Sequence, residues 1–294
     1  MRHGLHPYPA PSREGMGMRR ASRPHLASRV AAYLYITLVL AAFTLPTLYA
    51  LLTSLQPASV SLNPVPQWIF TPTLDNFVSL FEDSSFLGPV LNSVQSSVAS
   101  AALALAICAP AAYALSRANV SSSGVIGMWL LAARALPAIG LAIPAYAIFT
   151  RIGLSDTIVA LLLVYLPFNV ALATIMLKVF IDGIPRELDE AAAIDGASPL
   201  RTMLQVVLPV ARPGLASVTI MTFLFAWNNF LFPLVLTGSR SATIPLVLQK
   251  FLGSYTLQWN QVMAGVVLLS LPLIVLGAVF GRSMVGGLAA GSVK

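Results

Sequence analysis

Residues 156–180 read DTIVALLLVYLPFNVALATIMLKVF, and charged residues stand only near the two ends of this run, at Asp156 and Lys178. A helix of about 20 apolar residues is long enough to cross the hydrocarbon core of a bilayer, which is about 30 Å thick. The run therefore predicts a transmembrane helix. Pro167 lies near its middle and lacks the N–H that a helix interior uses, so we expect a kink there.

Five more apolar segments of similar length lie around this one. Their approximate bounds are 30–54, 91–116, 124–149, 209–236 and 261–282. The composition agrees, because the 294 residues are 57% hydrophobic and only 9% charged, whereas a soluble domain carries about 25% charged residues. We therefore predict an all-α polytopic membrane protein with six transmembrane helices. The same composition excludes disorder over the bulk of the chain.

Proline interrupts most of the predicted spans. In lipid, the backbone groups that a proline leaves free must be satisfied by neighbouring helices or by water. So many breaks are more typical of a bundle that lines a path than of a simple anchor. The second span is also rich in serine and alanine, which favours close packing between helices. The prolines are Pro46, Pro110, Pro137, Pro144, Pro167, Pro233 and Pro272.

Three residue counts restrict the chemistry. All three histidines lie within the first 25 residues, so the membrane body can hold neither a Ser-His-Asp triad nor an HExxH zinc site. Cys108 is the only cysteine, and its apolar surroundings favour a small buried hydrophobic residue over a reactive thiol. None of the three lysines follows a glycine, so the chain lacks a GxxxxGK[ST] phosphate loop. We expect no catalytic residue, metal or cofactor in this chain.

The positive charges indicate the orientation of the chain. Thirteen of the 17 Lys and Arg residues fall on one side of the predicted spans, three on the other, and Arg134 within a span. The positive-inside rule then places both termini in the cytoplasm. Because this pattern accounts for the net charge of +7, we do not expect nucleic-acid binding. Residues 1–28 are expected to form a disordered cytoplasmic arm with candidate starts at Met1, Met16 and Met18, and 29–294 to form the membrane domain.

The two long connections differ in charge. The outer one, near 55–90, contains no Lys or Arg, and its residues 73–77 predict the start of a short amphipathic helix. The inner one, near 181–208, holds five of the ten acidic residues of the chain. An acidic inner loop runs against the general trend for cytoplasmic loops, so it requires a specific explanation.

Two short helices are predicted inside the acidic connection, whose residues 184–209 read IPRELDEAAAIDGASPLRTMLQVVLP. Pro185 fits the first position of a helix whose opening turns carry Glu187 and further acids. Gly196 can take the left-handed conformation that ends this helix, and Ser198 fits the N-cap of a second helix that starts with proline. A solvated surface loop is the alternative interpretation.

The spacing within this stretch resembles the EAA motif of permease subunits in binding-protein-dependent ABC importers. Glu190-Ala191-Ala192 is followed after three residues by Gly196, and then by Val206 and Leu208-Pro209. The family prefers isoleucine where Val206 stands, which is a mild departure. The resemblance implies a coupling helix that lies in a groove of a separate cytoplasmic ATPase. The residues implied in this coupling are Glu187, Glu190, Ala191, Ala192, Asp195, Gly196, Leu208 and Pro209.

A wider resemblance, to the maltose-type branch of sugar importer permeases, runs from about residue 30 to the C-terminus. The core of the family's domain would lie at about 88–282. The matching segments are Arg134-Ala135-Leu136-Pro137, Ile143-Pro144, Gly153-Leu154-Ser155-Asp156-Thr157, Trp227-Asn228-Asn229-Phe230, in which Asn229 stands where an acid is common, and the terminal run 287–294.

This resemblance implies a set of partners. A second, homologous permease would form the translocation path together with this chain, which is expected to be a multi-pass protein of the bacterial inner membrane surrounded by lipid. A cytoplasmic ATPase dimer would bind ATP and Mg, and its closure would drive the spans between inward-facing and outward-facing states. An extracytoplasmic solute-binding protein would deliver the substrate.

Several polar or aromatic residues inside spans are candidates for the substrate path. A buried arginine such as Arg134 is costly in lipid, so it indicates a polar site on the path or an ion pair with the second permease. Snorkelling, or a bond to carbonyls freed by Pro137, is the alternative. Aromatic rings beside amides suit sugars, although they equally suit helix packing. These residues are Tyr165, Phe168 and Asn169 on one span and Trp227, Asn228 and Asn229 on another.

Two other function classes are less compatible with the sequence. An intramembrane enzyme would need paired aspartates or a serine with histidine or lysine, and the spans lack histidine. A secondary transporter usually carries acids at span centres and often inverted repeats, and neither is evident. For an ATP-driven importer, a di- or oligosaccharide is the expected substrate. A glycerol-phosphate-type polyol ester is the alternative, because its phosphate would favour Arg134.

Overall fold

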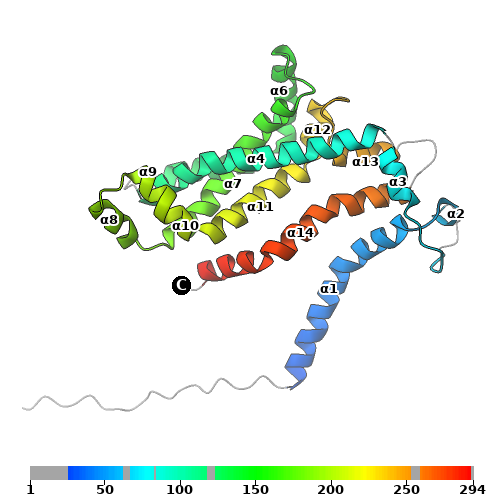
Figure 1. Cartoon of the computed structure of the whole chain (residues 1–294), viewed down its shortest axis with the longest axis horizontal. Coiled ribbons are helices and arrows are strands. Elements are labelled where there is room, and N and C mark those ends of the chain that lie inside the picture. The colour runs from blue at the N-terminus through cyan, green and yellow to red at the C-terminus, as the bar shows by residue number, and fades with distance from the viewer. Residues whose placement is uncertain (1–25, 62–66, 83, 118–122, 253–258, 293–294) are drawn as a thin grey trace, which may run out of the picture. The chain divides into compact units, whose positions relative to one another are not determined.

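The computed structural model describes residues 26–61, 67–82, 84–117, 123–252 and 259–292, and every regular element in these ranges is a helix. The expected N-terminal arm, 1–28, falls almost wholly outside the described residues, and so do its three candidate start positions. The chain divides into two units, Met1–Thr47 and Leu48–Lys294. The first contains most of helix α1, and the second contains all the other helices (Figure 1).

Four long helices confirm four of the predicted spans. They are α1 (Leu26–Ser54), α4 (Ser84–Arg117), α7 (Ile158–Asp182) and α14 (Trp259–Ser292). Each contains a segment long and apolar enough to cross a membrane. The apolar runs therefore located these helices correctly, although α4 and α14 extend several residues beyond the predicted bounds.

The third predicted span is bent. Helix α5 (Ser123–Ala135) and helix α6 (Ala138–Arg151) meet at an angle of 83°. The expectation of one span over 124–149 is corrected accordingly. Pro137 has no N–H to continue the hydrogen-bond ladder, and it lies in an extended conformation with ψ 117°.

The fifth predicted span is also broken. Residues 199–210, which include α10 (Leu208–Val210), meet α11 (Arg212–Trp227) at 85°, and a separate helix α12 (Leu231–Leu236) follows. The span predicted over 209–236 is therefore not one continuous helix. Pro213 opens α11 without a backbone donor, which explains why the ladder breaks there. If each bent pair counts as one span, the described residues contain up to six.

Three short helices complete the fold outside the spans and the acidic connection: α2 (Ala58–Ser61), α3 (Asp75–Glu82) and α13 (Ile244–Leu252). Helix α3 confirms the predicted amphipathic segment, because Leu80 is buried and Phe77 packs against the same cluster while the acids Asp75 and Glu82 are exposed. The Asn76 amide donates to the carbonyl oxygens of Ser54 and Gln56, both at 2.8 Å. These bonds attach α3 to the C-terminal end of α1.

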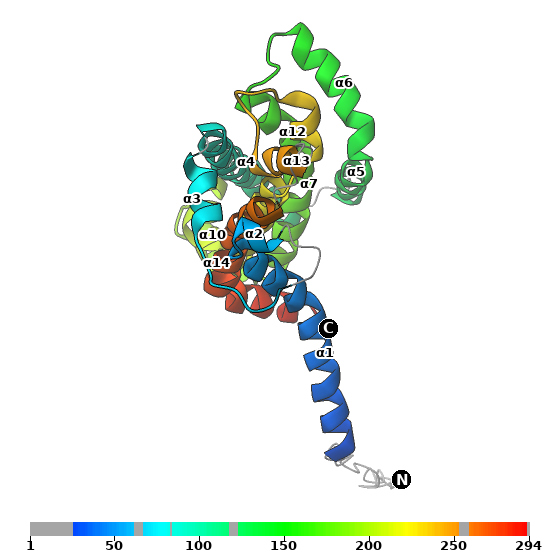
Figure 2. The same ribbon diagram turned by 90° about the vertical axis from the view of Figure 1, so that its right-hand side faces the viewer.

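Helices α4, α7 and α11 lie side by side and form the centre of the second unit (Figures 1 and 2). Small residues allow this close approach, as the serine and alanine content of α4 predicted. The buried cluster between the three helices includes Cys108, so its prediction as a buried small residue is confirmed. The other members are Ala109, Ala112, Ala173, Leu177, Ile181, Ile184, Val207, Ala211 and Val218.

At Gly214, α11 packs tightly against Phe180 of α7. A Cβ atom added there would lie 2.4 Å from Cγ and 2.8 Å from Cβ of Phe180. We expect Gly214→Ala to destabilise the protein by about 1–3 kcal/mol, because the helices must separate to admit the methyl group. The midpoint of thermal unfolding in detergent measures this. Gly277→Ala on α14 is the matched control, since its added Cβ meets no neighbouring atom within 4 Å among the residues that the structure describes. An equal midpoint for the two variants would contradict the close approach.

Candidate functional site

The acidic connection folds as two short helices at one end of the α4–α7–α11 bundle (Figure 1). They are α8 (Glu187–Ile194) and α9 (Pro199–Thr202), and the π-helical turn Met203–Val207 links α9 to α10. Gly196 has φ +78°, and the Ser198 hydroxyl accepts a bond from the Arg201 N–H at 3.4 Å. The predicted glycine turn and serine N-cap are therefore confirmed. The segment forms helices, so the alternative interpretation as a solvated surface loop is not supported. Pro185 lies two residues before α8 instead of at its first position.

Most of the residues expected to face a partner are accessible in this chain. Glu187, Glu190, Ala191, Asp195 and Gly196 are exposed. Ala192 is buried instead, and Leu208 and Pro209 are half-buried, so these three support the local fold.

Three apolar side chains of the same segment are also exposed. Ile194 is 87% exposed, and Leu200 and Leu204 are also exposed. Such a group of apolar side chains beside a helix end is typical of a surface that another protein covers.

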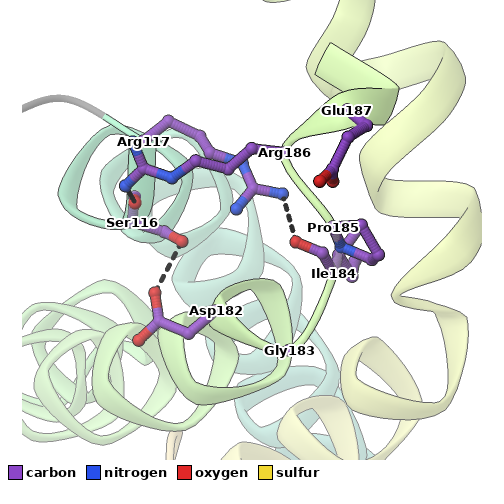
Figure 3. Close-up of a pocket in the computed structure, with 8 residues that line it drawn as sticks. All are labelled: Ser116, Arg117, Asp182, Gly183, Ile184, Pro185, Arg186 and Glu187. Atoms are coloured by element: carbon purple, nitrogen blue, oxygen red, sulfur yellow. Dashed lines mark hydrogen bonds between the residues drawn. The ribbon is translucent and has the colours of Figure 1, made fainter. Parts of the chain in front are cut away.

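The acids of the connection have partners on the last turn of α4. The Tyr113 hydroxyl donates to Asp189 at 2.8 Å, and the Arg117 guanidinium forms an ion pair with the same carboxylate at 2.9 Å. The Ser116 hydroxyl donates to Asp182 at 2.6 Å, as Figure 3 shows. These contacts account for two of the five acids in this inner loop, Asp182 and Asp189.

Two arginines complete the connection to α4. Arg117 donates to the carbonyl oxygen of Ile184, and Arg186 donates to that of Ser116, both at 3.0 Å (Figure 3). Residues 116–117 and 182–187 line an open hollow of about 620 Å³. The sequence did not single out Tyr113, Ser116 or Arg117 as site residues. The signal that could have indicated them is the excess of acids in 181–208, together with the arginine that follows the second apolar segment, 91–116.

The aromatic candidates for the substrate path form a buried cluster between α7, α11 and α12. Tyr165 and Phe168 contact Phe225 and Phe232, with ring centroids 5.7–6.2 Å apart. The Arg134 guanidinium lies over the Phe225 ring at 4.8 Å, a cation–π contact. The structure thus brings Arg134, Tyr165 and Phe168 to one cluster, and their contact with substrate stays a prediction.

The amide candidates mostly join helices or end them. Asn169 is buried on α7 and donates to the Ser100 hydroxyl at 2.8 Å and to the Thr222 carbonyl at 3.2 Å. Asn228 donates to the Leu224 carbonyl at the end of α11. The Asn229 side-chain oxygen accepts from the Phe232 N–H in the first turn of α12.

Trp227 lies apart from the aromatic cluster. Its indole N–H donates to the Leu269 carbonyl on α14 at 2.9 Å, and its ring stacks on Phe223 with centroids 5.6 Å apart. Only 3% of its surface is exposed in this chain. Trp227 and the amide side chains therefore make direct packing or hydrogen-bond contacts within the chain, as the packing alternative expects. Their contact with a substrate stays a prediction.

Asp156 organises the opposite end of the bundle. Its carboxylate accepts bonds from the N–H groups of Gly238 and Ser241 at 2.7 and 2.9 Å, from that of Arg240 at 3.2 Å, and from the Ser241 hydroxyl at 2.8 Å. Burial alone would raise the pKa of this carboxyl, but the hydrogen bonds outweigh burial and hold the pKa well below its usual range. Asp156 thereby ties the α6–α7 turn to the segment that follows α12.

Asp156→Asn is expected to lower the midpoint of thermal unfolding by about 5 °C at pH 7, because an amide cannot satisfy so many donors. The stabilisation comes from a lowered pKa, so it is complete above the unfolded value near 3.8 and is lost as the pH falls below it. The gap between the wild type and the variant should therefore shrink below about pH 4. Glu82→Gln, at an exposed acid on α3, is the control. A gap that grows on acidification would contradict this role.

Comparison with known proteins identifies the family. A probable ABC transporter permease protein of Sinorhizobium fredii is 33% identical over 252 residues, covering 86% of this chain and 91% of the relative. The trehalose transport system permease protein SugB of Mycobacterium tuberculosis is 33% identical over 276 residues, covering 92% and 100%.

Among solved structures, a bacterial ABC transporter involved in the import of the acidic polysaccharide alginate contains a chain with the same fold. It has a TM-score of 0.73 at 20% identity and covers 89% of this chain and 98% of that one. The family model described as the binding-protein-dependent transport system inner membrane component matches residues 102–285. This chain, a multi-pass protein of the inner membrane, therefore belongs to the permease family of binding-protein-dependent ABC transport systems.

Proposed function

We propose that this chain is a transmembrane permease subunit of an ATP-driven importer and forms half of the path for a di- or oligosaccharide. The relatives support the substrate class, because SugB is named for trehalose and the structural neighbour for the import of alginate, a polysaccharide. They favour a sugar over a polyol ester. Both termini would lie in the cytoplasm, the membrane domain would extend over 29–294, and a second permease would complete the path.

The exposed face of α8 is the single observation that carries the coupling role. It presents Glu187 and Glu190 beside the exposed apolar side chain of Ile194, on a helix held against the bundle. An ATPase groove with a basic rim and an apolar floor would fit this face. In this mechanism, ATP-driven closure of two ATPase subunits moves α8, and the spans change between inward-facing and outward-facing states. ATP and Mg belong to the ATPase.

The experiment that tests this function is a mild-detergent pull-down of the tagged chain, followed by mass spectrometry of its partners. We expect a cytoplasmic ATPase and a second permease, together with a solute-binding protein when its sugar is present. A matched pull-down with an unrelated tagged membrane protein controls for nonspecific capture. Recovery of this chain alone or as a homodimer, under conditions that preserve known importer complexes, would contradict the proposal and favour a secondary transporter.

A further inference from the structure

The last turn of α4 holds the beginning of α8 and the segment before it at several points. Tyr113, Ser116 and Arg117, which we name the α4 anchor, contact residues 66 to 76 positions later in the chain. The contacts include both oxygens of the Asp189 carboxylate, one from Tyr113 and one from Arg117. Since Asp189 lies in the first turn of α8, this hydrogen bond from Tyr113 and this ion pair with Arg117 together fix the direction in which the helix starts.

The ion pair at the centre of the anchor is shielded from water. The side chains of Arg117 and Asp189 are only 11% and 17% exposed. A shielded pair resists screening, and removal of one partner leaves the other charge poorly solvated. By contrast, the Lys178–Asp182 pair within α7 is 34% and 44% exposed, so it resembles an ordinary surface pair. The Arg117–Asp189 contact is therefore the stronger constraint on α8.

An apolar contact supports the same attachment from below. Ile184, in the segment before α8, and Val207, in the turn after α9, are buried in one cluster with Cys108 and Ala112 of α4. The region around α8 is thus held to α4 on both sides, by polar bonds at its start and by apolar packing beneath it. The position of α8 is therefore fixed by more than its covalent connection to α7.

The covalent link between α7 and α8 limits the distance between the two helices, but by itself it does not fix the direction of α8. Only the residues 183–186 separate α7 from α8, and such a short link through Gly183 would let α8 rotate about it. The contacts that α4 makes with Ile184 and Asp189, both beyond Gly183, restrain that rotation. A displacement of α8 must then move α4 with it, and α4 is packed along α7 and α11.

We propose that the α4 anchor is the positioning element that passes movement of α8 to the transmembrane bundle, with Arg117 as its central residue. This inference rests on the proposed function, because it requires that a partner ATPase moves α8. None of the anchor residues touches the ATPase or the substrate in this scheme. They act by keeping α8 and α4 as one rigid body.

The test uses the complete importer reconstituted in proteoliposomes and compares sugar uptake with ATP hydrolysis in the same preparation. Arg117→Ala should lower the sugar transported per ATP hydrolysed by about tenfold, while the complex assembles and hydrolyses ATP. Arg117→Lys should recover only part of the loss, because an ammonium cannot hold both the carboxylate and the Ile184 carbonyl in the same geometry. The double variant Arg117→Ala with Asp189→Asn should be no worse than Arg117→Ala, because the asparagine oxygen can still accept from Tyr113 while no buried charge is left without a partner.

Arg212→Ala is the matched control. Arg212 is an exposed arginine at the start of α11, and its side chain makes no hydrogen bond or ion pair with any residue that the structure describes. If the importer does not assemble with Arg117→Ala, the test uses Tyr113→Phe instead. This variant removes a single hydroxyl and should still lower the sugar transported per ATP hydrolysed by about threefold. Wild-type ratios in the assembled Arg117 or Tyr113 variant would overturn the inference. A wild-type chain without ATP-dependent uptake would instead overturn the proposed function.

Discussion

Gly196→Pro is expected to lower ATP-driven uptake by about 100-fold while the chain still inserts into the membrane. Gly196 has φ +78°, and proline is confined to φ near −65°. Proline also removes the N–H that bonds to the Ala193 carbonyl at 3.0 Å. A cost of about 3 kcal/mol corresponds to about a 100-fold loss of the native turn, since each 1.4 kcal/mol is tenfold. With the turn changed, α8 and α9 no longer present one surface.

Gly196→Asn distinguishes the effect of the backbone conformation at this position from the effect of side-chain size. In the described part of the chain, no neighbouring atom lies within 4 Å of a Cβ added at Gly196, so a larger side chain meets no steric barrier from these residues. Asparagine visits the left-handed region far more readily than other side chains, so Gly196→Asn should retain most of the uptake. The measurement is sugar uptake into proteoliposomes at equal protein content. Normal uptake by Gly196→Pro, or equal loss in both variants, would show that the turn conformation does not matter.

Glu190→Lys has the second large expected effect, a loss of coupled uptake of about 30-fold without a loss of folding. The Glu190 side chain is exposed and makes no hydrogen bond or ion pair with any residue in the described part of the chain. Reversing a charge in the opening turns of a helix costs about 0.3–1 kcal/mol, which the bundle tolerates. Any large effect must then come from the partner that covers α8.

Three measurements on the same membranes distinguish a loss of ATPase docking from a loss of folding in Glu190→Lys. The amount of chain in the membrane should match the wild type, the recovery of the ATPase in a pull-down should fall, and uptake should fall with it. Glu82→Lys is the control, because it makes the same charge change at an exposed acid on α3. Full uptake by Glu190→Lys would remove α8 as the docking element, whereas a chain missing from the membrane would point to a folding role.

The local features of the acidic connection could be predicted because they depend on neighbours in the sequence. Gly196 and Ser198 act within a few residues of themselves, through backbone conformation and one capping bond. The long helices could likewise be predicted from the apolar runs, since the length of a membrane span follows from the thickness of the bilayer. Pro137 indicated where the third span is interrupted. It did not indicate a bend of 83°, because that angle depends on the packing of α6 against α12.

By itself, the sequence determined that the chain is a helical membrane protein, where four of its long helices lie, and that 184–209 forms two short helices with a glycine turn. The tertiary structure decided what the charged residues do. Asp189 binds Tyr113 and Arg117 across 72 or more positions, and Asp156 binds residues 238–241 more than 80 positions away. Such pairings depend on which helix ends the packed bundle brings together, and periodicity or composition carries no information about that choice.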